Sequence, residues 1–422
     1  MLCNSVSCTA CGSCVTICPK NCIRFTTDDY GYTYPYIDTN NCINCGMCEK
    51  ACPVLTPVKK DSYVYPTVYC ASSKNTDTVL NSASGGIASE ITRLFTKELN
   101  GFACGVKSEE DNLPGFVLLD SESDFRSVSG SKYVHSRDNG IYKKVKECLD
   151  FDKKVFFCGL PCQVAALYSY IGGDNENLFT ADIVCHGCSE ESVYKSYLEY
   201  LQDKKGERIV NTEHTSKDKG WSILIQRLFK IEFESGDIIY RWSQQDAYLS
   251  LFLDSSIFRP ACYNCKFARF PRVGDITLGD FFGIGTINNI KSVNKNGVNM
   301  VMLNTEKGQD LYDMLLPYID SEERDIKEAV YYNLNLWRPS SKSRIQSDLQ
   351  KSISDINWDK ISDTYYNNKT DKTKRLIRKT IKTVLGDKNT ARLMLYTYNL
   401  NGITQKADEA LDNLKKFIAN LD

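Results

Sequence analysis

Eight cysteines in the first 52 residues repeat one spacing twice. Each copy reads C-x2-C-x2-C-x3-C-P, and every position recurs 34 residues later. The two copies contain Cys8, Cys11, Cys14 and Cys18, then Cys42, Cys45, Cys48 and Cys52. Thiolates at this spacing are typical iron–sulfur ligands, because three of them wrap one face of a cubane. The sequence therefore predicts two [4Fe–4S] clusters near its start.

The doubled motif resembles that of bacterial two-cluster ferredoxins. The fourth cysteine of each copy lies too far along the chain to join its own three and reaches the other cluster. A tetratricopeptide-like repeat shares the 34-residue period, but the helical apolar pattern that it needs is absent. Zinc is the other alternative. We expect one cluster on Cys8, Cys11, Cys14 and Cys52, and the other on Cys42, Cys45, Cys48 and Cys18.

The segment between the two copies predicts a short hairpin. Residues 23–25 and 34–37 are mostly apolar or aromatic and flank the turn sequence Asp28-Asp29-Tyr30-Gly31. Cys22 stands where an apolar residue would pack. We therefore expect Cys22 in the core and not among the ligands.

Two further cysteines follow predicted strands of a β–α region. The run Val155–Cys158 predicts a buried strand, and Pro161 predicts the first turn of a helix. The next strand is expected over residues 178–185. A right-handed helical crossover places the carboxyl ends of two parallel strands at one sheet edge, where open α/β sheets bind ligands. We expect Cys162 and Cys185 to lie together at that edge.

Cys262 and Cys265 form a C-x2-C pair in a predicted loop. Alone, such a pair fits a cluster, a zinc ion or a redox dithiol. Together with Cys162 and Cys185, it predicts a third iron–sulfur cluster. Zinc held by the two C-x2-C pairs is the main alternative, and spacing leaves Cys158 and Cys188 as further candidates.

A glycine-containing turn precedes a helical pattern. Asn81-Ser82-Ala83-Ser84-Gly85-Gly86 leads into apolar residues at helical spacing. The free backbone N–H groups of such a helix start can bind an anion such as a pyrophosphate, although a simple turn is the commoner interpretation. No G-x-G-x-x-G follows a strand, so a Rossmann dinucleotide site is not predicted.

Taken together, these motifs resemble those of the family of coenzyme F420 hydrogenase/dehydrogenase β-subunits. The resemblance covers about residues 65 to 340, in the family's order. The matching segments are Ser84–Gly86, Gly130–Val134, Phe157–Gln163, Cys185–Gly187, the Cys262 and Cys265 pair, and Gly274–Gly283.

The resemblance implies FAD on a non-Rossmann α+β scaffold with a [4Fe–4S] cluster close by. It favours Cys162, Cys185, Cys262 and Cys265 as cluster ligands over Cys158 and Cys188. It assigns the flavin site to Ser84, Gly85, Gly86, Ser131 and Lys132.

The chain departs from the family pattern at two positions. Phe282 stands where Trp is frequent, and His135 stands where Gln is common. Neither change removes a cluster ligand, but His135 is our candidate for altering what the flavin reduces. His186, between two cysteines, is expected to position a ligand and not to be one. His214 lies in a charged segment, where we expect it to be solvated.

Composition excludes several function classes. The 422 residues are 42% hydrophobic and 25% charged with a net charge of −1, so no global field attracts nucleic acid. No apolar run approaches the roughly 18 residues of a membrane span, and the first residues lack the pattern of a secretory signal. We therefore expect a cytoplasmic protein whose thiols stay reduced.

The expected fold class is α+β with three regions. These are a two-cluster ferredoxin domain over residues 1–58, a flavin and [4Fe–4S] domain over 62–340, and a helical tail over 341–422. Residues 374–385 predict a basic amphipathic helix. Such a helix usually packs against its own chain, but it also fits an anionic membrane or a partner. By analogy with relatives found beside polysaccharide-assembly enzymes, a peripheral association with the membrane or with such enzymes is one expectation. The sequence is also compatible with an oligomer.

These features predict an iron–sulfur flavoprotein oxidoreductase. Ferredoxin-type clusters would exchange electrons with FAD, and hydride would pass to or from a small organic substrate or F420. Ferredoxin or F420 is the expected redox partner. The alternative is an electron-transfer subunit of a larger complex with no substrate of its own.

Overall fold

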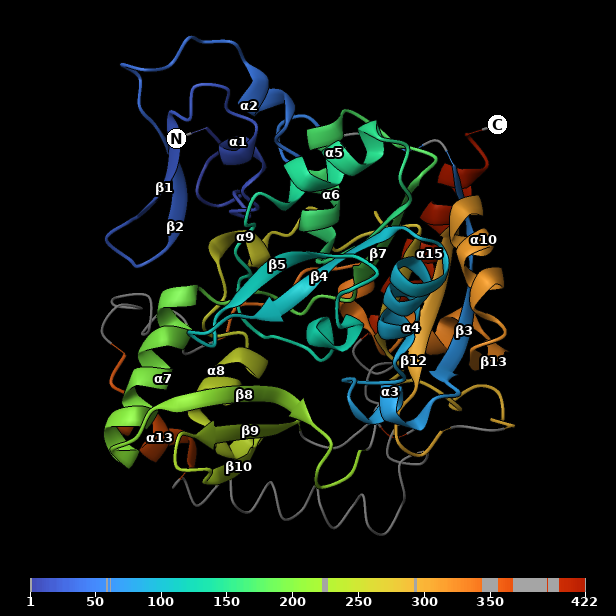
Figure 1. Cartoon of the computed structure of the whole chain (residues 1–422). Coiled ribbons are helices and arrows are strands. Elements are labelled where there is room, and N and C mark those ends of the chain that lie inside the picture. The colour runs from blue at the N-terminus through green and yellow to red at the C-terminus, as the bar shows by residue number, and fades with distance from the viewer. Residues whose placement is uncertain are drawn as a thin grey trace.

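The computed structural model describes residues 2–57, 60, 62–221, 227–291, 294–343, 356–366, 393 and 402–421. The described chain forms a small N-terminal domain, a large sheet with helices on both faces, and a separate three-stranded sheet (Figure 1). This is a mixed α/β arrangement. None of the described helices is long and apolar enough to cross a membrane.

The N-terminal domain contains the predicted hairpin. Strands β1 (Ile23–Thr27) and β2 (Thr33–Ile37) pair antiparallel, with Ile23 opposite Ile37. At the turn, Asp28 accepts hydrogen bonds from the backbone N–H groups of Tyr30 and Tyr32. The cysteine motifs place one short helix each, α1 (Ser13–Thr16) and α2 (Met47–Lys50), beside this hairpin.

The large sheet is parallel at its centre and antiparallel towards its edges. Its strand order is β13-β3-β12-β11-β7-β6-β4-β5, and β4, β6, β7 and β11 pair parallel in turn. The strands are β3 (Tyr63–Ser73), β4 (Phe102–Ser108), β5 (Pro114–Leu119), β6 (Val155–Gly159), β7 (Leu178–Ile183), β11 (Ile276–Asp280), β12 (Asn299–Thr305) and β13 (Ile319–Arg324).

Burial on both faces explains the apolar run of β6. Phe156 packs with α4 (Ile87–Arg93) and α10 (Glu306–Leu315) on one face, and Phe157 packs with α5 (Ile141–Asp150) and α6 (Pro161–Ile171) on the other. Successive strand residues point to opposite faces, so a central strand needs apolar side chains at every position. The predicted strand and the predicted helix start at Pro161 are both confirmed. Strand β7 ends two residues before the predicted Cys185.

A second sheet was not anticipated in the sequence. Strands β8 (Ile209–Ser216), β9 (Leu228–Phe233) and β10 (Ile238–Trp242) pair antiparallel in the order β10-β9-β8. They pack against α7 (Glu191–Lys205) and α8 (Ala247–Leu253) in a core that also includes Tyr32 and Tyr34 of the N-terminal domain. Figure 1 shows this unit beside the large sheet, on the far side from α10.

The other described helices are short or lie near the C-terminus. Within residues 341–422, α13 (Trp358–Tyr366) packs near α8, and α15 (Ile403–Ile418) packs against β3. The predicted basic helix over 374–385 lies outside the described residues. The remaining elements are α3 (Thr76–Leu80), η1 (Leu94–Glu98), η2 (Phe125–Val128), η3 (Ser243–Gln245), α9 (Pro260–Tyr263), α11 (Ile326–Val330), η4 (Leu334–Leu336), α13 (Trp358–Tyr366) and α15 (Ile403–Ile418).

Candidate redox site

Four of the predicted ligands surround one hollow in the N-terminal domain. We call Cys8, Cys11, Cys14 and Cys52 the inner thiol set; all four line this hollow, and they come from both copies of the motif. Burial, together with the nearby Cys52 and Cys8, raises the pKa of Cys11 to about 12. Thiolates crowded in this way need positive charge between them, which the iron of a cluster would supply.

The sequence did not single out a fifth thiol in the same hollow. Cys3 is buried, lines the hollow with the inner set, and has a pKa raised to about 11 by burial and by Cys52 and Cys8. It stands five residues before the first motif cysteine, outside any recognised spacing. Only the folded chain brings it beside Cys52.

The outer thiol set, Cys18, Cys42, Cys45 and Cys48, lies nearer the surface. Cys45 is exposed, and Cys42 and Cys48 pack partly buried against Cys18. Cys22 is buried as expected, but its Sγ also lies 3.3 Å from the Sγ of Cys18. Burial alone would raise the pKa of Cys18, but hydrogen bonds from Cys22 and nearby backbone N–H groups lower it.

The third thiol set, Cys162, Cys185, Cys262 and Cys265, gathers at the carboxyl edge of the sheet. Cys162 lies in the first turn of α6, Cys185 follows β7, and the other pair belongs to α9 and the loop after it. Burial raises the pKa of Cys162, and the charges of Cys185, Cys265, Cys262 and Cys11 raise it further. The four thiols therefore share one neighbourhood, which Cys11 of the inner set adjoins.

The two further candidates for cluster ligands, Cys158 and Cys188, lie in different surroundings. Cys188 is buried beside Cys262 and Cys185, so it belongs to the same neighbourhood. Cys158 instead lies near Asp182 and Lys132. No three His, Cys, Asp or Glu side chains of the described residues are close enough to hold a single metal ion. A [4Fe–4S] cubane is larger than a single metal ion, so its four thiol ligands lie farther apart from one another.

Residues 133–142 contact the N-terminal domain through several hydrogen bonds. The Tyr142 hydroxyl donates to the carbonyl of Cys11 at 2.8 Å, and Asp138 accepts from Thr16 at 2.8 Å. His135 Nε2 lies 3.3 Å from the carbonyl of Thr9. In Figure 1 the N-terminal domain accordingly lies against α5 and α6.

The environment of His135 favours its neutral form. Burial, together with the nearby Arg259 charge, lowers the pKa of His135 to about 4. A carbonyl only accepts hydrogen bonds, so Nε2 carries the hydrogen that faces Thr9. The structure thus places His135 against the inner cysteine loop.

The residues of the expected flavin site meet at the end of β8. Lys217, just after β8, donates to the carbonyl of Ser84 at 2.6 Å. Thr215 lies 3.5 Å from the backbone nitrogen of Ser131, and Lys132 donates to the carbonyl of Ser129 at 2.7 Å. Two segments far apart in the sequence are therefore joined by a strand of the second sheet.

Close packing and backbone conformation explain why Gly85 and Gly86 are glycines. A Cβ on Gly85 would clash with the backbone of Ala71 and Asn299. Gly86 has a φ of 84° and precedes α4, a conformation that favours glycine. The side chain of Asn299 also accepts from the N–H of Ile87 at 3.2 Å. The turn is thus required for packing whether or not it also contacts a ligand.

Three cations surround this region with few carboxylates to balance them. Burial lowers the pKa of Lys132 to about 8 and that of Lys217 to about 7. Arg227 pairs with Asp280, but among the described residues neither lysine has a carboxylate within ion-pair distance. Lys217 and Arg227 were missed in the sequence, because they flank strands β8 and β9 and belong to no motif.

The prediction for His214 is wrong. The side chain is 4% exposed and stacks on Phe229, with ring centroids 5.0 Å apart. Burial and the Lys132 charge lower its pKa to about 3, and its Nε2 has no hydrogen-bond partner among the described residues. The error arose because β8 alternates buried and partly exposed residues around His214, so its charged neighbour Glu213 faces away from the core.

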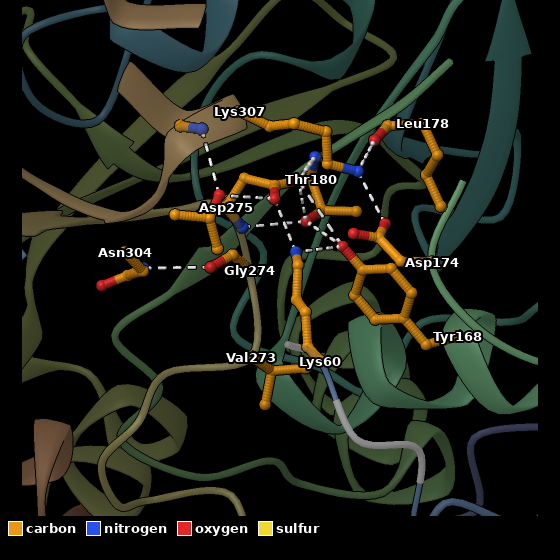
Figure 2. Close-up of polar contacts among 12 residues, drawn as sticks. Lys60, Tyr168, Asp174, Leu178, Thr180, Val273, Gly274, Asp275, Asn304 and Lys307 are labelled. Atoms are coloured by element: carbon orange, nitrogen blue, oxygen red, sulfur yellow. Dashed lines mark hydrogen bonds and ion pairs between the residues drawn. The ribbon is translucent and has the colours of Figure 1, made fainter. Parts of the chain in front are cut away.

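A buried ion pair attaches the linker to the large sheet. Lys60 donates to Asp275 at 2.5 Å and to the Tyr168 hydroxyl at 2.7 Å, as Figure 2 shows. The Thr180 N–H and hydroxyl each donate to Asp275 at 2.8 Å. The first aspartate of the Gly274–Gly283 motif therefore has a structural role, because it fixes the chain just after the N-terminal domain.

Comparison with known proteins finds two families along the chain. Residues 7–55 match the family described as 4Fe-4S dicluster domain. Residues 152–328 match the family described as the C terminus of the beta subunit in coenzyme F420 hydrogenase/dehydrogenase. Both families are found in this chain. The dicluster domain supports the presence of [4Fe–4S] clusters, and the β-subunit region includes the whole third thiol set.

Curated relatives match parts of the chain. The F subunit of the F(420)H(2) dehydrogenase of Methanosarcina mazei is 26% identical over 38% of this chain and 47% of its own length. A 7Fe ferredoxin of Hydrogenibacillus schlegelii is 50% identical over 10% of this chain and 47% of its own. An uncharacterised Methanocaldococcus jannaschii protein is 25% identical over 40% of this chain and 54% of its own. The chain thus spans about half the length of these relatives.

A solved structure shows a weaker likeness. It is the F420-reducing [NiFe] hydrogenase complex from Methanosarcina barkeri, which aligns with 75% of this chain and 94% of its own. The TM-score is 0.41 and the sequence identity is 15%.

Proposed function

We propose that this chain is an iron–sulfur flavoprotein oxidoreductase that exchanges electrons between ferredoxin-type clusters and FAD. The proposed ligands are the inner, outer and third thiol sets. The observation that carries the proposal is that α1, which contains Cys14 of the inner set, packs against α6, which contains Cys162 of the third set, so that the charge of Cys11 also reaches Cys162. Adjacent clusters are what single-electron transfer along a chain of cofactors requires.

The chemistry of the donors fits clusters at all three sets. Burial raises the pKa of Cys14 and of Cys185, and neighbouring thiols raise both further. Such thiols bind as thiolates only when cations compensate the charge, as cluster iron does. The Tyr142 and Asp138 hydrogen bonds hold the inner set against the body of the protein.

The donors at the end of β8 fit an anionic cofactor. We assign Ser84, Gly85, Gly86, Ser131 and Lys132 to the FAD site, and we add Lys217 and Arg227. Two partly buried ammonium groups without carboxylate partners favour a bound anion, such as the pyrophosphate of FAD. When bound, FAD supplies the exchange between hydride and single electrons. His135 faces Thr9, which makes it a better candidate for positioning the inner loop than for contacting a substrate.

The first test is iron, sulfide and flavin content after anaerobic purification. About twelve irons and one FAD per chain are expected for three cubanes. The variant C262S/C265S should lose about four irons, whereas C148S should lose none, because Cys148 lies on α5 and belongs to none of the three sets. About eight irons in the unaltered chain, and no loss in the double variant, would contradict a third cluster.

A second candidate function is an electron-transfer subunit without its own substrate. The Methanosarcina mazei relative is by name one subunit of a dehydrogenase, which favours this candidate. The exposed Cys45 would place the outer cluster within reach of a partner such as a ferredoxin. Turnover of F420 or another hydride donor by the isolated, fully loaded chain would contradict it. Co-purification of one stoichiometric partner without such turnover would support it.

A further inference from the structure

Arg259 is buried at the junction of the N-terminal domain and the body. It is 1% exposed and precedes α9, which contains Cys262. Its guanidinium pairs with Glu190 and donates to the carbonyl of Thr33 at 2.8 Å. It also lies over the ring of Tyr34, 5.2 Å from the centroid. One cation therefore contacts both parts of the molecule.

The charge of Arg259 reaches two thiol sets. Burial raises the pKa of Cys8, and Arg259 acts in the opposite direction. Burial and Cys265, opposed in part by Arg259, raise the pKa of Cys262 to about 12. Cys8 belongs to the inner set and Cys262 to the third, and the backbone N–H of Cys262 donates to the Arg259 carbonyl at 2.9 Å, so Arg259 lies near both proposed clusters.

One donor of Arg259 lacks an acceptor. Its Nε is buried and has no hydrogen-bond partner among the described residues. Buried N–H groups are nearly always paired, so an unmet one at this place calls for an acceptor that the protein chain does not provide. Sulfur atoms of clusters accept such bonds, and their reduction potentials respond to hydrogen bonds and to nearby charge.

We propose that Arg259 raises the reduction potentials of both the inner and the third cluster. Reduction adds a negative charge to a cluster, and a buried cation stabilises that charge. Glu190 offsets part of the effect, because its carboxylate pairs with the guanidinium. The third cluster rests on the proposed function, whereas the inner cluster does not depend on it.

The test is an anaerobic potentiometric titration of R259Q followed by electron paramagnetic resonance. Gln keeps a donor for Thr33 but removes the charge. At a fixed potential, the ratio of reduced to oxidised cluster should fall on the order of tenfold at both clusters, equivalent to about 59 mV for one electron. The outer cluster should not change. R259K retains the charge and should recover most of the shift.

A matched control separates this effect from a general disturbance. Arg324 is also a buried arginine, paired with Glu328 on the far edge of the sheet, and R324Q should leave every cluster potential unchanged. Unchanged potentials in R259Q, or equal shifts at all three clusters, would overturn the proposal. If the unaltered chain holds about eight irons, the third cluster fails, but the inner cluster still tests Arg259.

Discussion

Replacing Lys60 with Met should destabilise the protein by about 3 kcal/mol. The variant removes the cation that lies 2.5 Å from Asp275, in a pair with side chains 4% and 0% exposed. Breaking a buried ion pair costs about 3–5 kcal/mol, since one charge is left without compensation. Asp275 keeps hydrogen bonds from Thr180 and from the Thr305 hydroxyl, each at 2.8 Å, which places the loss at the lower end.

Urea unfolding under anaerobic conditions, followed by circular dichroism, measures this loss. With an m value of about 3 kcal/mol/M, the midpoint should fall by about 1 M. K146M removes the exposed pair between Lys146 and Asp150 and should cost less than about 1 kcal/mol. K60M/D275N should recover part of the stability, because no unpaired charge stays buried. A loss in K60M no larger than that in K146M would refute the reasoning.

The same pair predicts a pH dependence. Burial by itself would raise the pKa of Asp275, but Lys60, Lys307 and hydrogen bonds hold it below its usual value. A lowered pKa contributes stability above the unfolded-state value, and this contribution is lost as pH falls through the folded-state value. The difference in unfolding free energy between K60M and the unaltered chain should therefore shrink as pH falls below about 4. A difference that stays constant down to pH 2 would contradict the ionised state of Asp275.

Three further predictions concern individual sites. C52S should remove the inner cluster, although Cys52 is closer in sequence to the outer cysteines, and C18S should remove the outer one; electron paramagnetic resonance distinguishes the two. G283A should destabilise the fold by about 1–3 kcal/mol, because a Cβ there would clash with the backbone of Glu328; urea unfolding measures the cost. K217M should weaken FAD binding at least tenfold in fluorescence titration. In the unaltered chain, affinity should fall as pH rises above about 7, because the pKa of Lys217 is about 7 and only the ammonium attracts an anion.

Local patterns allowed several parts of the structure to be predicted. The hairpin between residues 23 and 37 and the strand and helix around Pro161 are confirmed, since turn residues and apolar runs act over a few neighbours. The parallel pairing of β6 and β7 follows from a crossover rule that needs only their order. The burial of His214 was not predicted in this way, because it depends on aromatic rings from other elements, Tyr133, Tyr194, Phe229 and Tyr248.

The sequence by itself determined the cysteine motifs, and with them the kind of cofactor, because thiolate ligation depends on residue type and short spacing. Only the tertiary structure decided which groups surround those cysteines. Arg259 lies near two thiol sets, Lys217 joins Ser84 at the end of β8, and Lys60 is buried against Asp275. Each of these contacts joins segments more than 100 residues apart or on different sheets. Their physical basis is burial and charge, and neither leaves a spacing that can be recognised along the chain.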